Sequence, residues 1–150
     1  MKIFVKDKLN LSETEVEIRC RERDDEVKSI IESIKSSENT LMGEKENGDI
    51  VPVPVSGVLY FEAVDRFVFA YTTSDFYRVR RTLYDLEDDL TGKHFVRISK
   101  SAVVNLKAVK SVAPEDARRL KLKLRNGEWI VVSRKYVSDF KLSIGMKEAK

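Results

Sequence analysis

The sequence predicts a mainly β protein of the α+β class, in which a multi-stranded sheet carries a few short helices. Two observations predict this class. Short runs of alternating apolar and polar residues recur along the chain, as in half-buried strands. Turn pairs such as Asn-Gly separate several of these runs, as expected for antiparallel hairpins. With 150 residues and 42% hydrophobic content, the chain can also bury a real core.

Residues 1–47 are expected to form a small strand-and-helix extension. Residues 2–5 and 15–21 are predicted strands, the second because Val16, Ile18 and Cys20 alternate with charged residues. Asp24 or Asp25 can then cap a helix, since an N-terminal carboxylate accepts hydrogen bonds from free amides. The apolar stripe of this helix consists of Val27, Ile30, Ile31 and Ile34.

Asn47-Gly48 predicts a hairpin between strands near 40–45 and 49–53, because both residues tolerate positive φ. Pro52 and Pro54 lack an amide donor, which restricts the second strand to a sheet edge or to the exit from one. The boundary between the extension and a main domain of residues 48–147 is expected here.

The main domain should begin with two strands around the turn Asp65-Arg66 and a third strand at Phe76–Arg80. Thr82 is expected to cap a helix that Thr91-Gly92 ends. The apolar face of this helix consists of Leu83, Leu86 and Leu90.

Residues 94–98 are predicted to form a strand with Val96 and Ile98 inward, after which Ser99 caps a short helix through Val103 and Val104. A strand at 107–113 should follow. Leucines then alternate with cations from Leu120 to Arg125, and Asn126-Gly127 turns the chain into a strand at Glu128–Val132. Ser133 is expected to cap a last helix. Its inward residues are Val137, Phe140 and Ile144.

Positive charge is concentrated in the last third of the chain. Residues 1–50 hold 9 basic and 13 acidic residues, whereas residues 101–150 hold 12 basic and 5 acidic ones. A field of this sign attracts phosphates, acidic proteins or anionic membranes to one end of the molecule. The alternative is a solvated, lysine-rich surface.

The sequence offers little for catalysis, and no cofactor, metal or small-molecule substrate is expected. The single Cys20 excludes an intramolecular disulfide and a multi-cysteine zinc site. His94 is the one histidine, without a second histidine or a sequence-adjacent carboxylate, and a surface or structural role is expected for it. The apolar runs are too short to cross a bilayer and the N-terminus lacks a signal-peptide pattern, so a cytoplasmic location is expected.

Basic residues gather beside the two predicted Ser-capped helix starts. Free amides at a helix start bind phosphate, and an arginine fork matches the two acceptors of guanine in the major groove. Arg66 could add a contact from a separate turn. The alternative is that the serines only cap and that the cations balance the acidic helix at 83–90. The cations beside the helix starts are Arg97, Lys100, Arg134 and Lys135.

The segment from Ile50 to Ile144 resembles the LytTR DNA-binding domain of bacterial transcription regulators. Four phrases carry the resemblance in order: VLYFEAVDRFVFAY, RRTLYDLEDDL, HFVRISKSAVVNLKAVKSV and LKLRNGEWIVVSRKYV. The resemblance implies a β-rich fold without a helix-turn-helix. It also implies that loops and helix starts enter successive major grooves of short direct repeats.

Matched by motif, the resemblance implies three groups of DNA-contacting residues. Arg66 lies in the first loop. Lys100 lies in RISKS, with Arg97, Ser99 and Ser101 beside it, and Arg134 lies in VSRKYV with Lys135 adjacent. The chain departs from the usual pattern at Ser99-Lys100, where His-Arg or His-Asn is frequent, and lysine is the less directional donor. Asn105 belongs to the motif and is expected to cap or support the fold.

Residues 1–47 are too short for a phosphate-receiving domain, so the chain resembles the stand-alone type of this family. The expected partners are double-stranded DNA, a second copy of the chain, and a small membrane protein that controls regulators of this type. The extension could dimerise or complete the core. The alternative function is a protein-interaction module whose basic face docks an acidic partner.

Overall fold

The structure is a computed structural model that describes residues 1–12, 14–38, 40–90 and 94–146. It forms two compact units, residues 1–34 and 35–150. The first unit contains most of α1 (Asp25–Glu38), which confirms the predicted helix. Asp24 caps it, because the Val27 N–H donates to Asp24 Oδ1 at 3.0 Å.

The strands predicted at residues 2–5 and 15–21 are wrong as strands within one chain. Both segments lie outside any strand, and Cys20 is exposed. Alternation of apolar and charged residues makes a segment suited to a sheet, but a strand also needs a neighbour that takes its backbone hydrogen bonds. Among the described residues, no other strand pairs with either segment.

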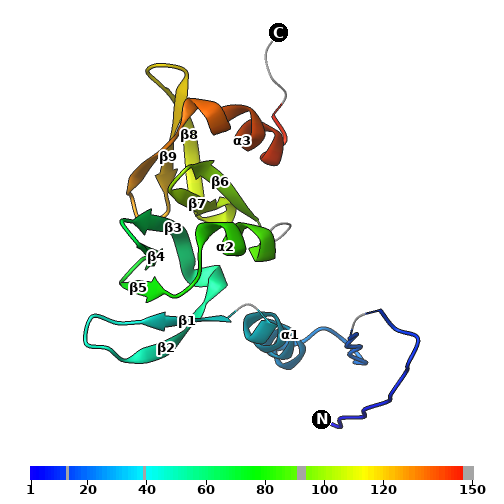
Figure 1. Ribbon diagram of the computed structural model, residues 1–150. Coiled ribbons are helices and arrows are strands. Elements are labelled where there is room, and N and C mark those ends of the chain that lie inside the picture. The colour runs from blue at the N-terminus through cyan, green and yellow to red at the C-terminus, as the bar shows by residue number, and fades with distance from the viewer. Residues whose placement is uncertain (13, 39, 91–93, 147–150) are drawn as a thin grey trace. The chain divides into compact units, whose positions relative to one another are not determined.

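The second unit is mainly β, as predicted, and is built on two antiparallel sheets (Figure 1). The larger sheet has seven strands in the order β2-β1-β5-β4-β3-β7-β6. Its strands are β1 (Thr40–Glu44), β2 (Ile50–Pro54), β3 (Val58–Val64), β4 (Phe67–Thr72), β5 (Phe76–Val79), β6 (Phe95–Ser99) and β7 (Ala102–Asn105). The smaller sheet, in the order β10-β9-β8, contains β8 (Val109–Glu115), β9 (Arg119–Leu124) and β10 (Trp129–Val132).

Short helices connect and cover these sheets. The α-helices of this unit are α2 (Leu83–Leu90) and α3 (Val137–Ser143), and the 3-10 turns are η1 (Val55–Gly57), η2 (Leu106–Ala108) and η3 (Arg134–Tyr136). Thr82 caps α2 as predicted, since its Oγ1 accepts the Asp85 N–H at 3.1 Å. The expected stop signal Thr91-Gly92 lies outside the described residues. None of the helices described here is long and apolar enough to span a bilayer.

The β1–β2 hairpin turns at Asn47-Gly48, where Gly48 has φ 90°, and β2 forms the sheet edge, as its two prolines predicted. β1 joins the sheet through a pair between Glu44 and Arg78 of β5. Gly43 permits this approach, because a Cβ there would lie 2.7 Å from Tyr77 Cβ and 2.8 Å from a Val53 methyl.

The larger sheet is buried on both faces at its centre. Val58 and Phe61 of β3 enter a core under α2, whereas Leu59 and Tyr60 enter a second core under the smaller sheet and α3. A β-bulge between Val58 and Tyr60 interrupts the alternation and turns two consecutive side chains toward the second core. Figure 1 shows α2 and α3 packed near the β6–β7 hairpin, which lies between the two layers.

The short helix predicted after Ser99 is wrong. Ser99–Ala102 instead closes a tight β6–β7 hairpin, and all four residues of β7 are buried. A continuous buried run that includes Val103 and Val104 suits a central strand covered on both faces. Long-range pairing with β3 and β6 therefore overrides the local capping signal of Ser99.

Asn105 is the one buried polar residue among the described residues, with 2% exposure. Its Oδ1 accepts the Lys107 N–H at 3.0 Å and its Nδ2 donates to the Val58 carbonyl at 2.9 Å. The expected structural role is thus confirmed, because this amide starts η2 and ties it to β3.

We predict that Asn105→Ala lowers the free energy of unfolding by about 2 kcal/mol, because it leaves a buried carbonyl and a partly buried amide without partners. Denaturant titration measures the change. Asn47→Ala is the matched control, since Asn47 Oδ1 also accepts an N–H two residues on but is exposed. Asn47→Ala should lower the free energy of unfolding by less than about 1 kcal/mol. Equal losses in the two variants would contradict the buried role of Asn105.

Candidate nucleic-acid interface

Three chain segments that were predicted to contact DNA are tied together at one end of the larger sheet. They are the β3–β4 turn, the β6–β7 turn and the segment that joins β10 to η3. The Ala63 N–H, near the end of β3, donates to the Ser101 carbonyl at 2.8 Å. The Ser133 N–H donates to the Ile98 carbonyl at 2.9 Å. Backbone bonds therefore fix each outer segment to the β6–β7 hairpin.

The β3–β4 turn consists of Asp65 and Arg66. Asp65 has φ 56°, a left-handed conformation that aspartate tolerates better than most residues. Both residues are exposed, and they connect Val64 to Phe67, which form the last residue pair of the β3–β4 ladder. Arg66 therefore projects from a turn whose strands are held in the sheet.

Arg97 supports the β6–β7 turn from beneath. Its Nε donates to the Ser99 carbonyl at 2.6 Å and its Nη2 to the Lys100 carbonyl at 2.5 Å. Its Nη1 donates to Glu87 Oε2 of α2 at 2.9 Å, and its side chain is only 19% exposed. One guanidinium thus joins the turn to α2, which makes the turn rigid.

The serines of this turn hold its tip. Ser99 Oγ accepts the Ser101 N–H at 3.1 Å, and the two hydroxyl oxygens lie 3.3 Å apart. Lys100 occupies the tip between them and is exposed. The turn therefore presents one cation and two hydroxyl groups, but it lacks the helix start that the sequence predicted.

The third segment departs from β10 into η3 and α3. Ser133 precedes η3, yet its hydroxyl makes no capping hydrogen bond, so the predicted side-chain cap is wrong. A backbone hydrogen bond is present at the start of η3 instead, since the Ser133 carbonyl accepts the Tyr136 N–H at 2.9 Å. Arg134 and Lys135 follow and are both exposed. Phe140, buried in the second core, anchors the helix behind them.

The basic residues of the candidate interface divide into two kinds. Arg97 forms an ion pair with Glu87 of the acidic helix. For Arg97, this agrees with the alternative in which the cations balance the acidic residues of that helix. Among the described residues, no carboxylate forms an ion pair with the remaining four cations. These are Arg66, Lys100, Arg134 and Lys135. They leave a positive charge that an anion can approach.

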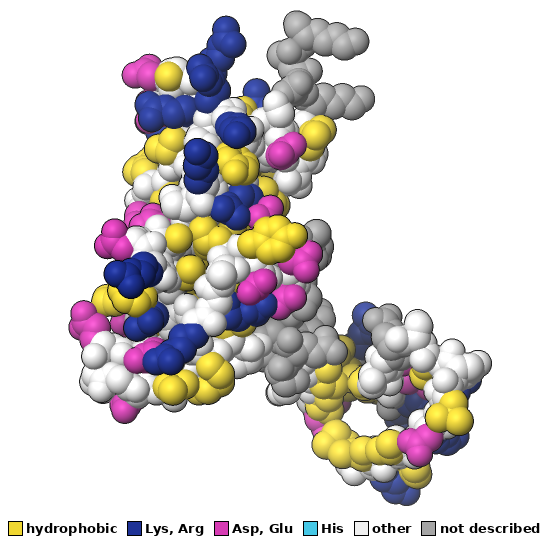
Figure 2. Space-filling model, in the orientation of Figure 1, with side chains coloured by type: hydrophobic (Ala, Val, Ile, Leu, Met, Phe, Trp, Pro, Cys, Tyr) yellow, Lys and Arg dark blue, Asp and Glu magenta, His cyan; other side chains and the backbone are white. Residues whose placement is uncertain are grey.

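Sequence reasoning missed a further basic element near the third segment. Val132 pairs with Leu120, which brings the β8–β9 turn to the end of β10 that leads into Arg134. Arg118 and Arg119 lie at that turn and are exposed. Figure 2 shows Lys and Arg side chains gathered at the tip of this hairpin, beside acidic ones. Only the cross-strand register brings these arginines to this end.

A groove of about 370 Å³ lies between the two sheets beside the β6–β7 turn. Its lining includes Ser99 and Ser101, but also Glu62 and Glu128. The Tyr60 hydroxyl donates a hydrogen bond to Glu128 Oε2 at 2.8 Å. Burial of the hydroxyl raises the pKa of Tyr60, and the hydrogen bond to Glu128 raises it further. The two carboxylates make the groove unsuited to a phosphate, so the candidate interface stays on the turns.

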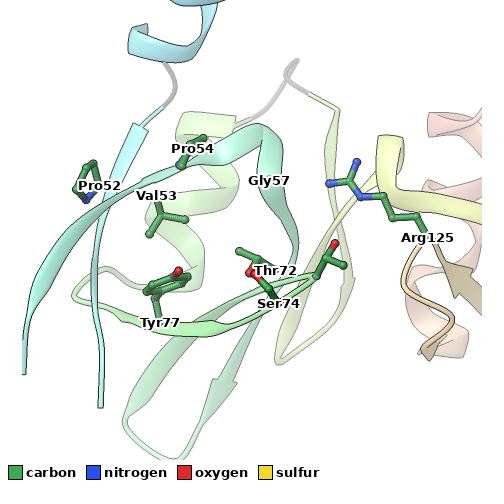
Figure 3. A pocket seen from close by; sticks show the side chains of 9 residues that line it. Pro52, Val53, Pro54, Gly57, Thr72, Ser74, Tyr77 and Arg125 are labelled. Carbon is green, nitrogen blue, oxygen red and sulfur yellow. The ribbon is translucent and has the colours of Figure 1, made fainter. Parts of the chain in front are cut away.

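A second groove, of about 310 Å³, lies between the β1–β2 hairpin and the β9–β10 turn (Figure 3). The charged residue in its lining is Arg125, whose Nη2 donates to the Ser56 carbonyl at 3.1 Å. Arg125 thus joins the smaller sheet to the chain that precedes β3. This groove is shallow and lined mainly by small or apolar residues, so it offers no evident chemistry.

Metal-binding clusters are not found among the described residues. No group of three or more His, Cys, Asp or Glu side chains could hold a metal ion there. His94 is exposed, with φ 68°, and its carbonyl accepts the Leu106 N–H at 2.7 Å, which fits the expected surface or structural role.

Comparisons with known proteins agree on one family. The family model of the LytTr DNA-binding domain matches residues 48–145. An HTH-type transcriptional regulator of Staphylococcus aureus strain NCTC 8325 is 30% identical over 137 residues, covering 89% of this chain and 92% of the relative. A counterpart of strain MRSA252 is 29% identical over the same shares of both chains.

A solved structure shares the fold. It is the LytTr DNA-binding domain of a protein described as a methyl-accepting/DNA response regulator from Bacillus cereus. The match has a TM-score of 0.68 and 28% identity, and covers 72% of this chain and 98% of that one. Although the relatives are called HTH-type, strands separate the α-helices in the described part of this chain, so no two consecutive α-helices form a helix-turn-helix.

We predict that Arg97→Ala loosens the β6–β7 turn, because the Ser99 and Lys100 carbonyls lose their shared donor. The backbone amide of Ser101, which donates to Ser99 Oγ, should exchange with solvent at least about tenfold faster, as measured by NMR-detected hydrogen exchange. Arg66→Ala is the matched control and should leave this rate unchanged. Unchanged exchange in Arg97→Ala would show that the hairpin holds its tip without the guanidinium.

Proposed function

The chain belongs to the LytTR DNA-binding domain family, and on that premise we propose that it regulates transcription by reading short direct repeats in DNA. In this proposal, the β3–β4 turn, the β6–β7 turn and the start of η3 enter successive major grooves. Residues 48–147 form the DNA-binding domain, and residues 1–47 form an extension.

One observation carries the proposal. The three segments come from distant parts of the sequence, yet backbone hydrogen bonds from Ala63 to Ser101 and from Ser133 to Ile98 hold them side by side. Each segment presents an exposed cation. Segments that are already held in place lose little conformational entropy on binding, which favours a precise fit to base edges over a loose electrostatic contact.

The residues have different proposed tasks. Arg134 reads a base through its planar fork, and Arg66 adds a second reading contact one groove away. Lys100 and Lys135 bind backbone phosphates, with the hydroxyls of Ser99 and Ser101 as further donors to them. Arg97 positions the turn that carries Lys100 and does not contact DNA itself, because its guanidinium already donates to groups of the protein.

The β8–β9 turn extends this surface. Arg118 and Arg119 would contact phosphates beyond the third segment, because the pairing of β9 with β10 brings the β8–β9 turn to the same end as Arg134. Two copies of the chain would bind two neighbouring repeats, as a homodimer in the cytoplasm, where bacterial DNA is found. Control by a small membrane protein is part of the same proposal.

We predict that Arg134→Ala weakens binding to the preferred DNA site by about 1–3 kcal/mol and reduces the preference over random DNA. Fluorescence anisotropy at fixed salt measures both affinities, after the site is selected from random sequences. The control is Arg23→Ala, which removes an exposed arginine of the first unit and should change neither value. An unchanged preference in Arg134→Ala would exclude base reading by this residue. If the wild type did not bind any DNA at low salt, the alternative function, docking of an acidic protein, would be favoured.

A different signature is expected for Lys100. Lys100→Ala should weaken binding to preferred and random DNA alike and lower the slope of log affinity against log salt by about 1, because one phosphate contact is lost. Lys45→Ala, in the β1–β2 turn, is the matched control and should keep the full slope. A selective loss at the preferred site alone would mean that Lys100 reads a base.

A further inference from the structure

The segment Glu15–Arg21 of the first unit has the pattern of a strand, but no strand among the described residues pairs with it. Glu15, Glu17, Arg19 and Arg21 alternate with Val16, Ile18 and Cys20. Residues 14–20 belong to no helix or strand, and Val16 is 64% exposed. Successive side chains of a strand point to opposite faces. In extended form this segment would therefore have one charged face and one apolar face.

The order of charges makes this segment complementary to a second copy of itself. If two copies run antiparallel and Ile18 faces Ile18, then Glu17 faces Arg19 and Val16 faces Cys20 on both sides of the centre. Glu15 then faces Arg21. Every charged position meets the opposite charge directly across the ladder, where such pairs stabilise a sheet. Parallel pairing in register would instead oppose like charges.

We propose that two copies of the protein dimerise through residues 15–21, which pair as antiparallel strands about a two-fold axis at Ile18. The interface is isologous, because the same seven residues serve both copies. Within the segment, the two glutamates precede the two arginines in sequence. A complementary antiparallel strand must therefore also carry its carboxylates before its arginines, and a second copy of the segment does so. Glu17 and Arg19 already lie 3.8 Å apart in one chain, and pairing would join both copies into a four-charge cluster.

The apolar face of this ribbon needs a cover, because an isolated two-stranded ribbon is only marginally stable in water. The first unit provides one. The stripe of α1 includes Ile30 and Ile31, which are both partly exposed. Three residues, 22–24, separate the strand from α1. Two helices, one from each copy, can therefore cover the apolar side of the ribbon with Val16 and Ile18 beneath them.

The proposal gives the dimer its interface and does not depend on the DNA contacts, because residues 15–21 lie outside the proposed DNA-binding domain. The test is made without DNA, by sedimentation velocity on the full chain. Failure would remove this interface and leave the DNA-binding proposal intact. Conversely, the DNA-binding proposal can fail while the dimer persists.

A charge exchange tests the register. Glu17→Arg and Arg19→Glu each replace two attractive cross-strand contacts of the homodimer with two repulsive ones, so each should raise the dimer dissociation constant by about tenfold or more. Mixing the two single variants should restore dimers, because every position again meets its opposite. The double variant carrying both exchanges should dimerise like the wild type. Lys8→Glu is the control for net charge and should leave dimerisation unchanged.

These outcomes are decisive because each variant should keep its fold at these exposed positions, and the mixture detects complementarity rather than stability. Dimers in the wild type, loss in both single variants and recovery in the mixture would support the antiparallel register. A monomeric wild type, single variants that dimerise normally, or a mixture without recovery would each overturn the proposal.

Discussion

The fold of the second unit depends on burying both faces of its central strands. Val103 and Val104 of β7 are fully buried, yet they belong to opposite cores. One face must therefore be covered by α2 and the other by the smaller sheet with α3. The bulge in β3 serves the same requirement, because it directs Leu59 and Tyr60 together into the second core. Burial of large apolar side chains supplies most of the driving force for this arrangement.

The candidate interface is a consequence of this two-sided sheet. The β6–β7 hairpin lies between both layers, so its turn can receive support from each of them. Arg97 reaches α2 on one side through Glu87, and the Ile98 carbonyl accepts Ser133 from the other side. Lys100 is consequently presented by a supported turn and not by a helix start. A rigid scaffold that presents functional turns is a common solution for binding sites.

The basic residues of the second unit that the structure describes include two structurally distinct groups. Arg97 and Arg125 donate to backbone carbonyls and hold elements of the second unit together. Arg66, Lys100, Arg134 and Lys135 are exposed, and no described carboxylate forms an ion pair with them. Net charge alone cannot separate these groups, because it counts them equally. The distinction lies in the carbonyl and carboxylate oxygens that surround each cation.

The sequence by itself determined the fold class, most strands of the second unit, the Asn-Gly turns and the Thr82 cap, because period-two alternation and turn chemistry are local signals. It also identified the family and the turns that carry the candidate contacts. Only the tertiary structure decided that Ser99 closes a hairpin, that Arg97 faces inward, and that Arg118 and Arg119 reach the same end as Arg134. Each of these depends on pairing between distant segments, which local preference does not encode. The strand predicted at 15–21 failed for the same reason, since alternation specifies the faces of a strand but not the neighbour that must pair with it.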